Sequence, residues 1–313
     1  MAACGGGGDD VDRVVAADAA QDTAARQQAQ ALGDVRRTTA ARAAATSKTN
    51  ACSLIHPFYW ELGGAQARKA SGSVDVGFTG TTKVAMASAS KWLYSAYVMQ
   101  TRALSPESVP YLNFTSGNID FETCLPRQTV QQCADARSNG GLSPDAVGRF
   151  NYDGGHMQRH AVMIGLGSWD SAKLAADYNR VLGTHVSFFS PWIEAGAETT
   201  ADDYAAFLRR IMTKGLKIEA ALGSNQVCTD PATCPTAMYS PTAKPMNYSL
   251  GHWVEVDFDG AYSSAGGAGF YPWISADKSL YGIVSRQGTA GTGDASADCG
   301  RAIRNAWVSM SAA

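Results

Sequence analysis

The sequence lacks an apolar run of about 20 residues, the length that spans a bilayer, and it lacks an excess of charge of either sign. Lys and Arg number 26 and Asp and Glu number 28, so the formal net charge is −2. Because nucleic-acid binding depends on basic patches, we expect no nucleic-acid partner. The 313 residues are 45% hydrophobic, which is enough for a sizeable core and excludes a mainly disordered chain.

Several catalytic motifs are also missing. The absence of a Gly-x-Ser-x-Gly elbow argues against an α/β-hydrolase, and no Gly-x-Gly-x-x-Gly follows a strand and opens a helix. His156 and His160 have the spacing of a helical zinc pair, but Met157 stands where a metalloprotease needs its glutamate. We therefore expect neither a metal ion nor a cofactor.

The seven cysteines indicate an oxidising compartment. Cys4 stands apart near the N-terminus, and the other six form an even set without a Cys-x-x-Cys pair. Two pairs are close enough in sequence for short loop staples, and the remaining two cysteines join the ends of the folded region. The expected disulfides are Cys52–Cys299, Cys124–Cys133 and Cys228–Cys234.

The N-terminal segment Ala2-Ala3-Cys4-Gly5 resembles the end of a bacterial lipoprotein signal, in which the cysteine becomes lipidated. The charged and apolar parts of such a signal are missing from the chain, and a chance Ala-rich start is the alternative. The resemblance implies an exported protein, periplasmic or tethered to the outer membrane through lipid on Cys4, and otherwise secreted. Residues 1–48 are then a tether, disordered or loosely helical around 18–32, because they show no strong apolar stripe.

From residue 51 the pattern is that of a folded α/β protein. Short aromatic or apolar runs predict strands, and apolar residues at helical spacing predict helices. The expected strands are 58–62, 72–76, 84–86, 252–258, 269–274 and 280–285, and the expected helices are 88–100, 157–164, 171–182, 201–214 and 302–308. The simplest architecture is an α/β domain, with residues 49–105 and 245–313 forming the sheet and residues 106–244 a helical insertion domain.

The segment Ser88-Ala89-Ser90-Lys91 is the first candidate for chemistry. Residues three apart share a helix face, so the Ser88 hydroxyl and the Lys91 amine can approach each other. Lys91 acts as a base only if burial or a neighbouring cation lowers its pKa. Ser275-Ala276-Asp277-Lys278 matches the same pattern, but it lies between two predicted strands and is typical of a turn.

Two further segments are candidates. Tyr152, in Asn151-Tyr152-Asp153-Gly154-Gly155, can present its phenol to a cleft for proton transfer. The stretch Ser263-Ser264-Ala265-Gly266-Gly267 precedes a predicted strand, and its small residues let a substrate lie against backbone N–H groups.

Together, in this order and at these spacings, the three segments resemble the motifs of the penicillin-recognising serine hydrolases, which include β-lactamases, DD-peptidases and esterase and amidase relatives. The resemblance covers about residues 50–313 and implies an antiparallel sheet flanked by terminal helices, with a helical insertion. It makes Ser88 the acylated nucleophile, Lys91 its proton partner and Tyr152 the general base and acid. The third motif falls on Ser264, Ala265 and Gly266, and the amides of Ser88 and Gly267 would form the oxyanion hole.

The sequence departs from the family pattern at two positions. Gly154 replaces the Asn that usually ends the Tyr motif, and Ser264 replaces the Lys or His that begins the third motif. Because that cation assists a substrate carboxylate, its absence favours a less charged ester or amide. Arg286 is a candidate substitute for the cation, and His156 a candidate partner near Tyr152.

The sequence therefore predicts an exported serine hydrolase that cleaves a small or short oligomeric ester or amide through an acyl-enzyme. Two alternatives stay open: a DD-peptidase or β-lactamase with the same fold, and a non-catalytic binding protein of the cell envelope. Apart from lipid on Cys4, no contact with a membrane is expected.

Overall fold

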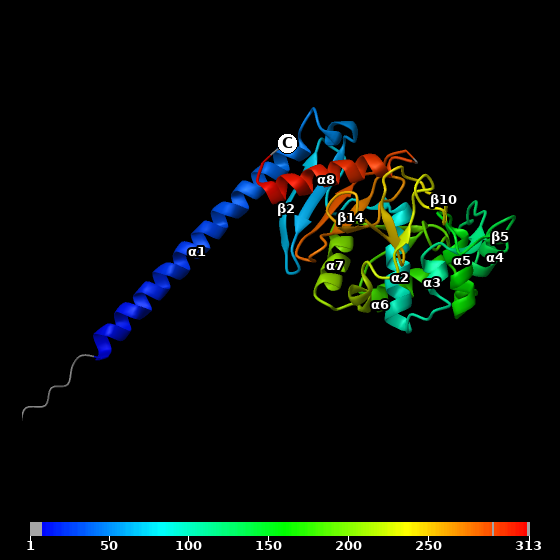
Figure 1. The fold of residues 1–313 in the computed structure, drawn as a ribbon, viewed down its shortest axis with the longest axis horizontal. Coiled ribbons are helices and arrows are strands. Elements are labelled where there is room, and N and C mark those ends of the chain that lie inside the picture. Colours follow the sequence, from blue (N-terminus) through cyan, green and yellow to red (C-terminus); the bar gives the residue numbers. More distant parts are fainter. Residues whose placement is uncertain (1–7, 290, 312–313) are drawn as a thin grey trace, which may run out of the picture.

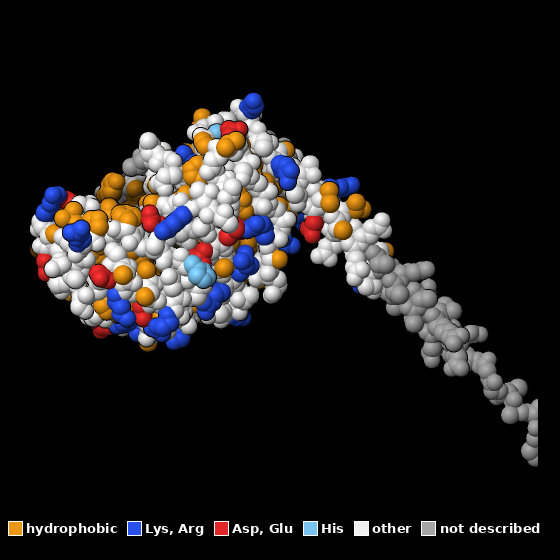
Figure 2. Space-filling model, turned by 180° about the vertical axis from the view of Figure 1, so that it is seen from behind, with side chains coloured by type: hydrophobic (Ala, Val, Ile, Leu, Met, Phe, Trp, Pro, Cys, Tyr) orange, Lys and Arg blue, Asp and Glu red, His pale blue; other side chains and the backbone are white. Residues whose placement is uncertain are grey.

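The computed structural model describes residues 8–289 and 291–311, with side chains from residue 23 onward except that of residue 24. One long helix, α1 (Gly8–Ala45), projects from a body that contains all the other elements (Figure 1). Acidic and basic side chains are interspersed over the face shown in Figure 2. None of the described helices combines the length and apolar character that a membrane span requires.

An antiparallel sheet of eight strands is the centre of the body, in the order β2-β1-β15-β14-β13-β12-β11-β9. The strands are β1 (Phe58–Gly63), β2 (Arg68–Val74), β9 (Val227–Cys228), β11 (Asn247–Ser249), β12 (His252–Val254), β13 (Tyr262–Ser263), β14 (Tyr271–Ile274) and β15 (Tyr281–Ser285). Since β1 pairs with β15, the sheet is built from both ends of the chain. An antiparallel sheet built from both ends of the chain confirms the predicted α/β fold class.

Side chains of β1 alternate between the two faces of the sheet, as the period of a strand requires. Phe58, Trp60 and Leu62 belong to the core beneath the C-terminal helix α8 (Gly293–Ser309), whereas Tyr59 belongs to the core on the opposite face. The Cys52–Cys299 disulfide joins the short helix before β1 to α8. Each face of the sheet therefore packs against a hydrophobic core of its own. The Cys52–Cys299 disulfide belongs to the core beneath α8.

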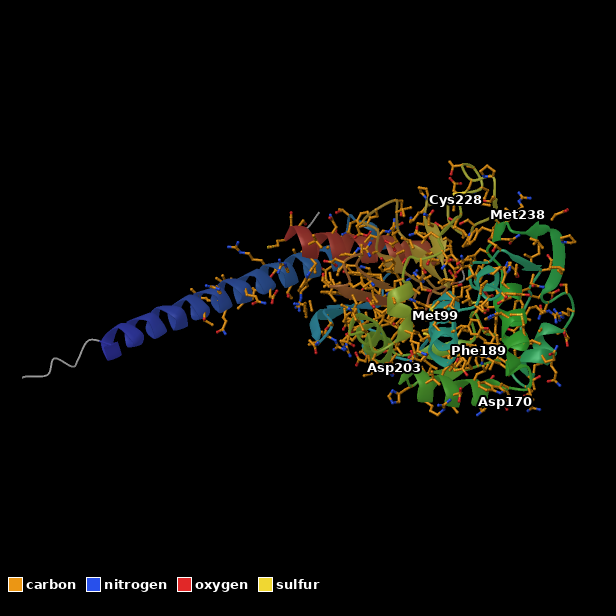
Figure 3. The ribbon with its side chains drawn as sticks, turned by 60° about the horizontal axis from the view of Figure 1, so that its bottom comes forward. Met99, Asp170, Phe189, Asp203, Cys228 and Met238 are labelled. Carbon is orange, nitrogen blue, oxygen red and sulfur yellow. A yellow bond between two sulfur atoms is a disulfide. The ribbon has the colours of Figure 1, made fainter. Side chains whose placement is uncertain are left out.

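The opposite face is covered by the helices of the middle of the chain (Figure 1). Helix α2 (Ser90–Thr101) is buried on all sides from Ser90 to Met99, and α7 (Ala201–Met212) packs against β14 and β15. Further out lie α3 (Val109–Leu112), α4 (Val130–Ala134), α5 (Gly155–Ala161) and α6 (Ser171–Leu182). In Figure 3, Met99 of α2 lies inside the body, whereas Asp170 before α6 lies at its edge.

Further short strands pair in the helical region and next to it; of these, the sequence predicted only the first, at 84–86. They pair as β3 (Val84–Ala85) with β8 (Ala197–Thr199) and β7 (Ser187–Phe188), as β4 (Ser116–Ile119) with β5 (Gly141–Val147), and as β6 (Phe150–Asn151) with β10 (Ala237–Tyr239). Two of these small sheets hold the loops that form the candidate active site.

The N-terminal helix is longer than the sequence suggested. It is continuous from Gly8 to Ala45, and its last turns pack against α8 through four buried alanines, Ala40, Ala41, Ala44 and Ala45. The exposed part therefore ends before residue 40, so a tether of residues 1–48 is too long by about two turns. Alanines gave no visible apolar stripe because a small side chain contributes little to hydrophobic periodicity, although it permits close helix packing. The predicted lipidation site, Cys4, lies outside the described residues.

The structure contains all three expected disulfides, including Cys124–Cys133 and Cys228–Cys234. Cys228 lies at an edge of the body in Figure 3, on the same side as Met238. The second Ser-x-x-Lys segment lies in the turn between β14 and β15, as predicted: Ser275 Oγ bonds Asp277, and Lys278 Nζ bonds Glu219.

Candidate active site

Ser88 lies on a tight turn between β3 and α2, within a short 3₁₀ segment (Ala87–Ala89). The turn is anchored by the Met86 N–H, which donates to the Ala197 carbonyl over 3.0 Å. Ala87, directly before the serine, has a φ of 47°, in the left-handed region that a β-carbon disfavours. Gly266 approaches the Met86 carbonyl so closely that any side chain there would collide with it. The backbone around Ser88 is thus held in one strained conformation, as is common at functional sites.

Lys91 places its amine on Ser88, as the helical spacing predicted. Lys91 Nζ donates to Ser88 Oγ over 2.9 Å, and only 2% of the lysine side chain is exposed. Lys91 Nζ also lies 2.7 Å from Glu194 Oε2. Burial alone lowers the pKa of Lys91, but the Glu194 carboxylate, together with Tyr152, raises it above its ordinary value. The condition under which Lys91 would act as a base, a lowered pKa, is therefore not met, because the Glu194 carboxylate lies beside it.

Tyr152 reaches the same site from β6. Its N–H donates to the Tyr239 carbonyl over 3.1 Å, which fixes the loop against β10. Its ring stacks on Trp253 at a centroid distance of 5.3 Å and meets Phe114 edge-on at 5.2 Å. The ammonium of Lys91 lies 4.7 Å from the centroid of the Tyr152 ring. The structure thus brings together Ser88, Lys91 and Tyr152, which come from distant parts of the chain.

Glu194 is the member of this cluster that the sequence analysis missed. It belongs to a loop between β7 and β8, and only 8% of its side chain is exposed. Its second carboxylate oxygen, Oε1, accepts a hydrogen bond from Trp192 Nε1 over 3.0 Å. No motif marks this residue; the only sequence signal is a lone acidic side chain within the otherwise uncharged run 186–197.

Asp153 is a second carboxyl close to the cluster. Its Oδ1 accepts hydrogen bonds from the backbone N–H groups of Phe121 and Gly155, each over 3.0 Å. Burial raises the pKa of Asp153 to about 6; the Gly155 N–H opposes this, and the charge of Glu194 adds to it. Asp153 therefore titrates within the range in which hydrolases are commonly assayed.

A pocket of about 110 Å³ opens beside Ser88 and Tyr152. Because a cavity needs roughly 10–15 Å³ to hold one water, the pocket has room for a group of several heavy atoms. Gly267 and Ser88, whose amides are predicted to form the oxyanion hole, both line it. The other two predicted residues, Gly266 and Ser264, form hydrogen bonds within the protein. The Gly266 N–H donates to the Phe270 carbonyl over 2.8 Å, and Ser264 Oγ donates to the Ser88 carbonyl over 3.3 Å.

The cationic residues that line this pocket, Arg301 and Lys244, are already paired. Glu255 is buried between the guanidinium groups of Arg301 and Arg304, at 2.9 and 2.7 Å. Burial tends to raise the pKa of Glu255, but these two arginines hold it below its ordinary value. Lys244, at the rim, lies 2.9 Å from Asp298. The pocket therefore offers no unpaired cation among the described residues that line it.

Arg286 does not replace the missing cation. It is not among the lining residues of the pocket. Its Nε donates to Ser296 Oγ over 2.9 Å and its Nη2 to the Thr292 carbonyl over 3.3 Å, so it braces the loop before α8. The hydrogen bonds of Arg286 are thus made to the segment 292–296 and not within the pocket, so they do not support it as the substitute cation.

His156 supports the Tyr152 loop from inside the protein. It is fully buried, bonds the Asn151 carbonyl through Nε2 and Ser116 Oγ through Nδ1, and stacks on Phe114. Burial lowers the pKa of His156 to about 4. Within the part of the chain that the structure describes, no group of three or more His, Cys, Asp or Glu side chains is placed to hold a metal ion.

The structure resembles solved structures of hydrolases. EstCE1, a hydrolase with promiscuous acyltransferase activity, superposes with a TM-score of 0.65 at 12% identity, covering 87% of this chain and 99% of that one. The D-amino acid amidase of Ochrobactrum anthropi gives a TM-score of 0.64 at 12% identity, with the same coverage. A structure described as a putative β-lactamase from Bacteroides dorei gives 0.56 at 22% identity, covering 80% and 92%.

No protein-family model and no curated protein matches the sequence. The structural similarity nevertheless extends over most of the chain and includes a penicillin-binding protein from Bacillus halodurans. The chain has the β-lactamase and penicillin-binding-protein fold, which confirms the fold implied by its three motifs.

Proposed function

We propose that this protein is an exported serine hydrolase that cleaves a small ester or amide through an acyl-enzyme on Ser88. The observation that carries the proposal is the 2.9 Å contact between Lys91 Nζ and Ser88 Oγ, beside a pocket that Ser88 and Tyr152 both line. A serine hydroxyl with an ammonium and a phenol beside it can supply the nucleophile and the proton transfers of acyl transfer.

In the first half of the reaction, Ser88 Oγ forms a bond to the substrate carbonyl carbon and its proton passes to the oxygen of Tyr152. Because Lys91 keeps its proton, the acceptor in this proposal is Tyr152 in its phenoxide form, which becomes the phenol, with the Lys91 ammonium 4.7 Å from the centroid of its ring. The amides of Ser88 and Gly267 hold the negative oxygen of the tetrahedral intermediate. The bond to the leaving group breaks as Tyr152 returns the proton to it.

In the second half, water replaces the leaving group. Tyr152 takes a proton from a water molecule as the oxygen of that water attacks the acyl carbon. The proton then returns to Ser88 Oγ as the carboxylic acid is released. The net change is hydrolysis, with no co-reactant other than water.

The pocket favours a small, uncharged or weakly charged substrate. Its volume is about 110 Å³, and its lining includes the apolar side chains of Met246 and Trp253. Ser264 stands where the family has its cation, and its hydroxyl is bonded to the Ser88 carbonyl. We expect turnover of short p-nitrophenyl esters to exceed turnover of nitrocefin, and the reverse order would instead favour a β-lactamase.

A fluorophosphonate probe tests the nucleophile. The wild type should be labelled and Ser88→Ala should not, as measured by intact mass. Ser275→Ala is the matched control, because Ser275 begins the second Ser-x-x-Lys segment but lies in a surface turn, and it should label like the wild type. Equal labelling of Ser88→Ala and the wild type refutes the nucleophile, and no labelling of any form favours a non-catalytic binding protein.

Export and tethering are part of the same proposal. The three disulfides support folding in an oxidising compartment, and the sequence around Cys4 supports lipidation. Mass spectrometry of the protein purified from bacterial membranes should find acyl chains on Cys4, and an unmodified Cys4 thiol contradicts the lipid anchor.

A further inference from the structure

We propose that Glu194 is a positioning residue of the site, whose carboxylate occupies the space above Gly154 and holds Lys91 in contact with Ser88. The inference rests on the proposed function. It assigns the task left open by the missing Asn of the Tyr motif to a residue on a different loop.

The Glu194 carboxylate lies directly beside Gly154. A β-carbon added to this glycine would collide with Glu194 Oε1 and would approach Phe121 Cδ1 to 3.0 Å. The Glu194 carboxylate therefore fills the volume into which any side chain at position 154 would project. The two residues depend on each other sterically, because the missing side chain at Gly154 leaves the space that the Glu194 carboxylate occupies.

Both oxygens of Glu194 have a defined partner. Oε2 lies 2.7 Å from Lys91 Nζ, and Oε1 accepts from Trp192 Nε1 over 3.0 Å. A deeply buried ion pair restricts the orientation of both side chains, because turning one of them away would leave the other charge unpaired and away from water. Lys91 is thus held between Glu194 and Ser88 and has little freedom to turn elsewhere.

The loop that carries Glu194 is fixed by a buried amide from α5. Gln158 accepts from the Ile193 N–H over 3.1 Å and donates to the Pro191 carbonyl over 3.1 Å. After the loop, Ala197 bonds both Met86 and Ser90 on either side of the nucleophile. The loop and the Ser88 turn therefore form one connected unit, which is what a positioning role requires.

The charge of Glu194 also determines the form of Lys91. Without the carboxylate, burial remains as the main influence and lowers the pKa of Lys91. A neutral Lys91 no longer stabilises the ionised phenol of Tyr152. Loss of the carboxylate should therefore alter the pH dependence of the reaction as well as its rate.

The test compares Glu194→Gln, Gly154→Asn and the double variant Gly154→Asn/Glu194→Ala. Measurements are kcat/KM for a p-nitrophenyl ester from pH 5 to 10 and the rate of fluorophosphonate labelling of Ser88. For Glu194→Gln we expect kcat/KM to fall about ten- to a hundred-fold and the alkaline limb to move down by about one pH unit or more. Gly154→Asn alone should lose activity through collision with Glu194, and the double variant should recover about ten-fold over it.

Glu198→Gln is the matched control, because Glu198 is a partly exposed carboxylate on β8 whose ion pair, at 3.3 Å, is with Lys83 and not with Lys91. It should keep the wild-type rate and profile. If Glu194→Gln is poorly folded by its unfolding temperature, Trp192→Phe replaces it: this variant removes only the bond to Oε1 and should shift the alkaline limb in the same direction.

An unchanged pH profile in folded Glu194→Gln or in Trp192→Phe overturns the inference, as does a double variant no more active than Gly154→Asn. These results leave the proposed function intact as long as wild-type Ser88 is labelled. Absence of that labelling removes the proposed function and this inference with it.

Discussion

At the scale of single residues, the charge on Lys91 decides how the site works. Its contact with Glu194 makes it an ammonium, so its role is to orient Ser88 and stabilise Tyr152 rather than to remove a proton. Spacing along one helix sufficed to predict the Ser88–Lys91 contact. The contribution of Glu194 could not be predicted, because it depends on how a distant loop packs, and a single carboxylate carries no pattern.

Asp153→Asn tests the local electrostatics. A carboxyl whose pKa is raised by folding stabilises the folded state fully below about pH 4, and this contribution is lost as the pH rises through about 6. Relative to the wild type, the free energy of unfolding of Asp153→Asn should therefore rise by about 2 kcal/mol between pH 4 and pH 7, allowing for partial exposure. Urea denaturation at both pH values measures the change. A difference that does not vary with pH contradicts the raised pKa.

At the scale of elements, strong hydrophobic periodicity predicted the helices reliably. Helix α6 has the predicted bounds, and α7 begins at the predicted residue, where Thr200 caps it by accepting from the Asp203 N–H. The short strands β4 to β6 escaped prediction because two to seven residues in a loop-rich region show no clear alternation. The full length of α1 escaped it because four small alanines make the contact with α8.

Truncation of α1 tests where the folded body begins. A chain that starts at Asp34 should keep the wild-type unfolding temperature, since side chains from 25 to 32 are exposed. A chain that starts at Ser47 also loses the four buried alanines, worth about 3 kcal/mol in total. Its unfolding temperature should fall by about 5–10 °C in differential scanning calorimetry. Equal temperatures for the two truncations contradict a structural role for the end of α1.

At the scale of the whole molecule, three buried histidines make the fold sensitive to acid. Burial lowers the pKa of His156 and of His160 to about 4 and that of His252 to about 3. These groups bind protons more readily when unfolded, so their contribution to stability is lost as the pH falls from about 6.5 toward 4. Asp153 and Glu61, whose pKa values burial raises, offset part of this loss.

The free energy of unfolding should therefore decrease from pH 7 to pH 5, by about 1.4 kcal/mol per pH unit or more near pH 5. Guanidinium denaturation at several pH values measures the slope. His160→Gln should reduce the slope by roughly one proton, about 1.4 kcal/mol per pH unit. A wild-type stability that is constant or higher at pH 5 contradicts the burial of neutral histidines.

The most direct test of the account is the mass of the protein during turnover of a p-nitrophenyl ester. Acid quenching within the first turnovers, followed by proteolysis and mass spectrometry, locates any covalent intermediate. The account predicts an acyl group on the peptide that contains Ser88, and neither the adduct nor hydrolysis in Ser88→Ala. An acyl group on another residue, or hydrolysis by Ser88→Ala at the wild-type rate, contradicts it.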